Sequence, residues 1–128
     1  MLKQKIYLSF KGGILGTIVL SLLIMASPMI GFPRMPIWEV LARLIGAPVI
    51  VGWIAHFAVG IVLAGLYVFW FKEKLKGNHA LRGMIFSLLP FALAQIAAIA
   101  SGGFDFLLLL GSLLGHLAYG LVLGLSAK

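Results

Sequence analysis

The sequence has few charged residues, very few acids and no cysteine. Among its 128 residues, 3 are acidic and 10 are basic, only 10% are charged, and 62% are hydrophobic. A soluble domain averages about 25% charged and about 45–50% apolar residues. The composition therefore excludes an ordinary soluble domain and a disordered chain. The lack of cysteine excludes a small secreted domain held by disulfides.

The shortage of carboxylates and thiols also limits the chemistry that the chain can perform. Glu39, Glu73 and Asp105 all fall between apolar segments. A serine–histidine pair needs an acidic group that orients the histidine, and a zinc ion needs three or four protein ligands. We therefore expect no catalytic residue, no metal site and no enzymatic activity.

The net charge of +7 does not indicate a nucleic-acid partner. A nucleic-acid-binding protein spreads its basic residues over a surface that faces water. Here the basic residues gather in short patches between long uncharged runs. We expect no nucleic-acid binding.

Four uncharged apolar runs are long enough to cross a membrane, which takes about 20 residues in a helix. Backbone polar groups must be satisfied internally in lipid, so each run is predicted to be an α-helix. The sequence thus predicts an all-α membrane protein, with residues 1–128 as a single four-helix transmembrane domain. The expected spans are 12–30, 49–71, 82–100 and 105–126.

The segment 37–46, between the first two spans, is predicted to form a short helix. Its expected apolar face carries Trp38, Leu41 and Ile45. On another face, Glu39 and Arg43 are four residues apart and are expected to pair. An amphipathic helix of this kind lies at the membrane interface. The alternative is a plug or a docking element.

The distribution of basic residues predicts the orientation, because they accumulate on the cytoplasmic side. Four crossings leave only Arg34 and Arg43 on one side. The other side receives Lys3, Lys5, Lys11, Lys72, Lys74, Lys76, Arg82 and Lys128. Both termini are therefore expected in the cytoplasm.

Two segments, 52–64 and 112–124, are similar in sequence. Histidine, alanine, glycine, valine and leucine recur in register at a constant spacing of sixty positions. The histidine is the informative match, because ionisable residues are rare in membrane helices. We predict a duplicated helical hairpin, which gives a parallel repeat with a pseudo-two-fold axis along the membrane normal.

Small residues at intervals of four surround both histidines. Residues spaced in this way share one helix face and let membrane helices approach closely. The residues predicted to form these packing faces are Gly52, Gly60 and Ala64 around His56, and Ser112, Gly120 and Gly124 around His116. Both faces are expected to turn toward the interior of the bundle.

The two histidines fall at similar depths in their spans and define a candidate polar cluster. A rise of 1.5 Å per residue places them roughly 12–15 Å from one membrane surface. The expected cluster consists of His56, His116 and Gln95, with Trp53, Ser112 and Tyr119 nearby and Ser21 at a similar depth.

Several roles of this cluster stay open. The imidazoles can hydrogen-bond each other, Gln95 or the backbone carbonyl that Pro90 leaves free near Phe86, in a purely structural role with no cofactor. They can serve as the two axial ligands of a haem b, since helical bundles hold cofactors between facing helices. They can bind the head of a quinone or another lipid-like molecule, or belong to a small transporter or channel.

Three short motifs carry a resemblance to a known group of proteins. They are the glycine-rich start of the first span at Gly12, the spacing of Trp53 and His56, and the combination of His116, Tyr119 and Gly120. With these motifs the chain resembles small uncharacterised bacterial four-helix membrane proteins. The resemblance covers most of the chain and implies the same fold and a bacterial inner membrane, and it brings no catalytic role.

The function expected from the sequence follows from what the chain lacks. Without a soluble domain, an acidic coupling residue or a motif of known chemistry, we expect an accessory, scaffold or assembly subunit of an inner-membrane complex. Its expected partners are the lipid bilayer and either other membrane subunits or further copies of itself.

Overall fold

The computed structural model describes residues 1–100, 102–103 and 105–128, and these residues form helices and turns without a strand. The elements are α1 (Leu2–Ala26) with the 3-10 turn η1 (Ser27–Ile30), α2 (Ile37–Ile45), α3 (Val49–Leu66) with the π-helical turn η2 (Tyr67–Phe71), α4 (His79–Ala100) and α5 (Phe106–Ser126). Four stretches are long and apolar enough to cross a membrane, namely Leu2–Ile30, Val49–Phe71, His79–Ala100 and Phe106–Ser126. The prediction of an all-α bundle with four long apolar helices is confirmed.

The helix bounds differ from the expected spans mainly at the amino end. The second expected span, 49–71, coincides with α3 and η2. Helix α1, however, begins at Leu2 and not near residue 12. The expected start was the first residue of the apolar run. The helix extends further toward the amino end because lysines do not interrupt a helix and the segment before Gly12 contains neither glycine nor proline. Helix α4 begins at His79, directly after a turn at Gly77 with φ +105°.

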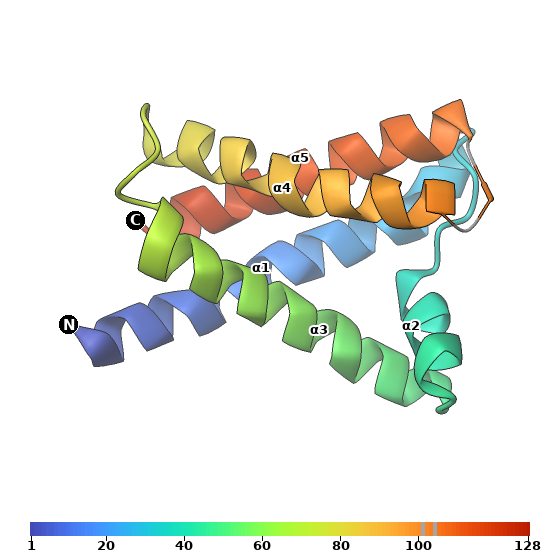
Figure 1. Cartoon of the computed structure of the whole chain (residues 1–128), viewed down its shortest axis with the longest axis horizontal. Helices are drawn as coiled ribbons and strands as arrows, with labels where there is room; N and C mark the ends of the chain where they lie inside the picture. The colour runs from blue at the N-terminus through green and yellow to red at the C-terminus, as the bar shows by residue number, and fades with distance from the viewer. Residues whose placement is uncertain (101, 104) are drawn as a thin grey trace.

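Helix α1 lies at the centre of the arrangement. It packs against both α3 and α5, while α4 packs on α5 and α2 packs on α3. Figure 1 shows that the end of α3 and the start of α4 lie close together at the segment 72–78, and that the two helices diverge toward α2. Both termini lie at the same end of the molecule as this segment (Figure 1).

The convergent end holds the hydrophobic core. Its buried members are Leu8, Ala64, Tyr67, Val68, Phe86, Tyr119, Leu123 and Ala127. The Tyr67 and Phe86 rings lie 5.4 Å apart, centroid to centroid. The core fills the space between the helices at this end. Toward α2 the helices diverge and leave space between them.

Glycines determine how closely the helices approach at three contacts. A Cβ on Gly120 would overlap the carbonyl oxygen of Gly83, and one on Gly124 would overlap that of His79, so α5 contacts α4 through its backbone. A Cβ on Gly60 would overlap the hydroxyl of Thr17 in α1. Close backbone approach of this kind is typical of membrane helices.

The third glycine contact holds α2 against α3. A Cβ on Gly52 would overlap the carbonyl oxygen of Trp38, and Ala42 lies beside it. The Trp38 and Trp53 rings stack with their centroids 4.0 Å apart and an interplanar angle of 10°. Trp38 and Ala42 are the buried residues of α2, whereas Ile45, which was expected on the apolar face, is 56% exposed.

The ion pair of α2 also differs from the prediction. Glu39 was expected to pair with Arg43, but both of its carboxylate oxygens accept hydrogen bonds from Arg34. The turn at Pro36 brings the Arg34 guanidinium over the first turn of α2, where it makes a two-pronged contact with the carboxylate. These bonds lower the pKa of Glu39 and raise that of Arg34.

Candidate functional site

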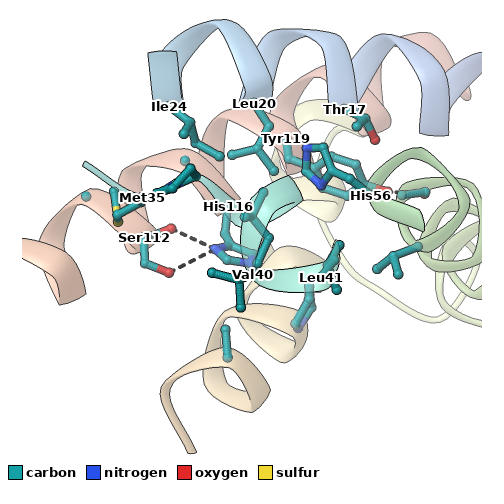
Figure 2. Close-up of a pocket in the computed structure, with 18 of the residues that line it drawn as sticks. Thr17, Leu20, Ile24, Met35, Val40, Leu41, His56, Ser112, His116 and Tyr119 are labelled. Atoms are coloured by element: carbon teal, nitrogen blue, oxygen red, sulfur yellow. Dashed lines mark hydrogen bonds between the residues drawn. The ribbon is translucent and has the colours of Figure 1, made fainter. Parts of the chain in front are cut away.

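A cavity of about 560 Å³ occupies the α2 half of the bundle, between the diverging helices. Every helix contributes to its wall, and Figure 2 shows most of the side chains that line it. Most of them are apolar, and the polar or charged ones are Thr17, Arg34, Arg43, His56, Ser112, His116 and Tyr119. A site for a small molecule is typically about 300–1,000 Å³, largely apolar, with a few polar groups.

Small side chains leave this space open. Gly60, Ala94, Gly111 and Gly115 contribute little or no side chain to the wall, and they come from three helices. Val59 on α3 and Ala94 on α4 line the cavity and are themselves exposed. The cavity is therefore accessible between α3 and α4, and the exposed wall residues Arg34, Val40 and Arg43 make it accessible at the α2 end as well.

His56 is held by a short chain of hydrogen bonds to α1. Its Nε2 lies 3.0 Å from Oγ of Ser21, and that hydroxyl donates to the carbonyl oxygen of Thr17 at 2.7 Å. The imidazole is 6% exposed and has the rings of Trp38 and Trp53 beside it, each with its centroid 6.1 Å away. The two tryptophans thus cover this histidine from the α2 end.

His116 is bonded within its own helix. Its Nδ1 lies 2.7 Å from the carbonyl oxygen of Ser112 and 3.3 Å from the hydroxyl oxygen of the same residue (Figure 2). The side-chain amide of Gln95 donates to that hydroxyl at 3.0 Å, which connects α4 with α5. The Phe91 ring packs edge-on against the imidazole, with the centroids 5.9 Å apart.

Tyr119 joins α5 to α3 at the inner end of the cavity. Its hydroxyl donates to the carbonyl oxygen of Gly60 at 2.6 Å, and its side chain is 3% exposed. The ring also lies against Gly16 of α1, where an added Cβ would come within 2.7 Å of it. One side chain therefore ties three helices together directly below the cavity.

The structure brings together most of the residues proposed from the sequence. His56, Ser112, His116 and Tyr119 line the same cavity. Gln95 contacts it only through Ser112, and Trp53 stacks on Trp38 outside the wall. In place of the expected bonds between the imidazoles or to Gln95, His56 bonds the Ser21 hydroxyl. His116 does bond a backbone carbonyl, but that of Ser112 in its own helix and not the one near Phe86.

The sequence did not indicate the part that α2 plays in the site. Val40 and Leu41 close one side of the cavity, and Trp38 covers His56. The only signal was the amphipathic pattern of 37–46, which is equally typical of a helix lying on a membrane surface. Contact with α3 cannot be read from that pattern.

No cluster of three or more histidine or carboxylate side chains that could hold a metal ion occurs in the part of the chain that the structure describes. The cavity offers a ligand two imidazoles, together with Arg34 and Arg43 of the wall.

Four apolar spans around a cavity with two imidazoles define the class: a multi-pass helical membrane protein with an internal cavity. The chain belongs to the family of unknown function DUF6789, whose model matches residues 3–128. A search of curated proteins and a search of solved structures gave no match.

Proposed function

We propose that this protein is a non-enzymatic membrane protein that binds a lipid-soluble small molecule in the cavity between α3 and α4. The observation that carries the proposal is the cavity of about 560 Å³, largely apolar but lined by His56 and His116. A quinone-like or other lipid-like molecule matches this lining, because its apolar part fits the wall and its polar head can meet an imidazole.

The position of the cavity supports a ligand that arrives from the bilayer. His56 lies seven residues after the start of α3, which is roughly 10 Å along the helix. One opening lies between α3 and α4, and the neighbouring surface consists of apolar side chains such as Val59 and Leu93. A molecule dissolved in the hydrocarbon layer can therefore enter without crossing a polar surface.

A haem b is a poorer fit to the same residues. Both histidines line the cavity, but Nε2 of His56 is in a hydrogen bond with Ser21 in α1. Axial ligation by this nitrogen would require that bond to break and the ring to leave its place beside Trp38 and Trp53. A transporter is also less well supported, because proton or cation coupling in membranes commonly uses a carboxylate and the cavity wall contains none among the described residues.

The proposed location is the bacterial inner membrane, with both termini in the cytoplasm. The role of an accessory, scaffold or assembly subunit is compatible with ligand binding and stays a prediction. Its support is the large apolar exterior, in which residues of all four long helices are exposed to lipid or to neighbouring proteins.

The ligand is tested by purifying the protein in a mild detergent and analysing its organic extract by mass spectrometry. We expect a lipid-soluble molecule in near-stoichiometric amount with the unmodified protein. Ala94→Phe, which places a ring in the cavity, should lose it. Ala92→Phe, on the same helix but outside the cavity wall, is the matched control and should retain it. Equal amounts of every lipid in both variants would refute the proposal.

A further inference from the structure

The hydrogen bonds around the cavity fix which imidazole nitrogens carry a proton. A carbonyl oxygen only accepts hydrogen bonds, so Nδ1 of His116, at 2.7 Å from the Ser112 carbonyl, must be the donor. A charged side chain at this depth is costly, so the ring is neutral and has one N–H. Nε2 of His116 is therefore a bare acceptor, and it lies on the side of the ring away from the Ser112 oxygens (Figure 2).

His56 has the opposite tautomer. The Ser21 hydroxyl has one proton, which it donates to the Thr17 carbonyl at 2.7 Å. The contact between Ser21 and Nε2 of His56 is a hydrogen bond only if Nε2 carries the proton. The second nitrogen of this ring, Nδ1, is bare, but the ring itself is only 6% exposed.

Two donors at or beside the cavity are used within the protein. The Tyr119 hydroxyl donates to Gly60, and the Gln95 amide donates to Ser112. The Thr17 hydroxyl has no hydrogen-bond partner and belongs to the cavity wall, but it is only 1% exposed, where α1 meets Gly60. The Ser112 hydroxyl accepts from Gln95 and lies beside Nδ1 of His116, on the far side of that ring from Nε2. His116 is the more accessible of the two imidazoles. At a distance from the arginines of the α2 end, it therefore offers a ligand a hydrogen-bond acceptor, its Nε2.

We infer that the cavity selects a ligand with a hydroxyl group, which donates a hydrogen bond to Nε2 of His116 while its hydrocarbon part lies along α3 and α4. This inference rests on the proposed function and narrows it. A quinol, a sterol or a long-chain alcohol has the required donor. A quinone, an ether or an ester has only acceptors and would face the bare nitrogen without a bond.

The first experiment tests the tautomers and needs no ligand. The protein is labelled with 15N-histidine, and the proton correlations of the ring nitrogens are recorded in detergent micelles. His79→Gln removes the third histidine and simplifies the assignment. We expect a proton on Nδ1 in one ring and on Nε2 in the other, with His116→Gln removing the former. A proton on Nε2 of His116 would overturn the inference.

The second experiment compares two probes that differ only in the donor. Tritiated 1-hexadecanol is bound to the detergent-solubilised full-length protein and displaced by unlabelled 1-hexadecanol or by 1-methoxyhexadecane. One hydrogen bond corresponds to a preference of about threefold to tenfold for the alcohol. His116→Phe and His116→Leu should bind both probes equally, whereas His79→Phe, outside the cavity, should keep the preference.

The outcomes separate the two proposals. Displacement by both compounds with equal strength from the unmodified protein would refute the hydroxyl preference and leave the lipid-binding function standing. A preference that survives in both His116 variants would refute the role of this histidine. No saturable binding of hexadecanol, combined with no co-purified ligand, would refute the proposed function itself.

Discussion

At the scale of single residues, two glycines on α3 offer a matched comparison of what close helix contact contributes. A Cβ on Gly60 would overlap the Thr17 hydroxyl and come within 3.3 Å of the Gly13 carbonyl oxygen, whereas one on Gly65 would meet only Ser9 Oγ at 3.9 Å. We expect Gly60→Ala to lower the free energy of unfolding by about 1–3 kcal/mol through overpacking. Gly65→Ala should leave it unchanged or raise it by up to about 1 kcal/mol, because alanine is the better helix former. Unfolding in mixed micelles monitored by circular dichroism measures both, and equal values for the two variants would contradict the packing described for Gly60.

Two buried tyrosines form a second matched pair. The Tyr119 hydroxyl donates to the Gly60 carbonyl, whereas the Tyr67 hydroxyl has no hydrogen-bond partner among the described residues. Tyr119→Phe should cost about 0.6 kcal/mol, the average for an interhelical hydrogen bond in a membrane. Tyr67→Phe should cost nothing or stabilise the fold, since an unpaired buried hydroxyl carries a penalty of about 1–3 kcal/mol. The same unfolding measurement checks the order, and a larger loss in Tyr67→Phe would contradict it.

Individual site residues could be predicted from the sequence because histidine, serine and tyrosine are conspicuous in apolar spans. His56, His116, Ser112 and Tyr119 indeed line one cavity. Their hydrogen-bond partners could not be predicted, because partner choice depends on helix rotation within a fraction of a turn. The bond from His56 to Ser21 requires a crossing of α1 and α3 that small-residue spacing indicates but does not fix.

At the scale of elements, α2 depends on contacts that sequence patterns describe only in part. The expected amphipathic helix is present, but its buried face is set by the fit of Trp38 and Ala42 against Gly52 and not by hydrophobicity alone. The pairing of Glu39 with Arg34 arises because the chain turns at Pro36 before the helix starts. The start of α1 could not be predicted from the apolar run either. The length of such a run indicates how much of a helix crosses the membrane, and not where the helix begins.

Because an ion pair holds the start of α2, we predict that the position of α2 depends on pH. The Arg34 hydrogen bonds lower the pKa of Glu39, so the pair contributes stability above the ordinary carboxylate pKa and loses it as the pH falls through the lowered value. We expect the stacking of Trp38 on Trp53 to loosen in that acidic range. Fluorescence of these two tryptophans, in a Trp70→Phe background, measures the change.

Two carboxylate variants serve as controls for this titration. Glu39→Gln should abolish the acid-dependent change and leave the fluorescence close to its low-pH value throughout. Asp105→Asn removes the cap of α5, where the carboxylate accepts from the Leu107 and Leu108 backbone, and should keep the response of the Trp38 stack. A transition that persists in Glu39→Gln would assign the effect to another group.

At the scale of the whole molecule, the helices form a closed end and an open end. The core around Tyr67 and Phe86 closes the end that holds both termini, and the cavity occupies the end that holds α2 (Figure 1). The duplication of a helical hairpin stays a prediction, and α3 and α5 each contribute one histidine to the cavity wall. The two helices nevertheless have different surroundings, because α2 covers only the first histidine.

The basic residues follow the same division and predict the direction of the protein in the membrane. Lys72, Lys74 and Lys76 lie between α3 and α4 at the end where both termini are found, and only Arg34 and Arg43 lie at the α2 end (Figure 1). Since positive residues are retained on the cytoplasmic side, the closed end should face the cytoplasm. The cavity mouth and α2 would then lie near the outer surface of the inner membrane.

The absence of cysteine makes this orientation directly measurable, because a single introduced thiol is the only one in the chain. Leu44→Cys lies in α2 at a residue that is 78% exposed, and Lys74→Cys lies in the segment 72–78. In intact bacterial cells whose outer membrane is permeable to it, a maleimide that cannot cross the inner membrane should label Leu44→Cys. Lys74→Cys should react only after the inner membrane is opened with detergent, and the unmodified protein should not react at all. The reverse labelling pattern would show that the charge distribution does not orient this protein, and would place the cavity mouth in the cytoplasmic half of the bilayer.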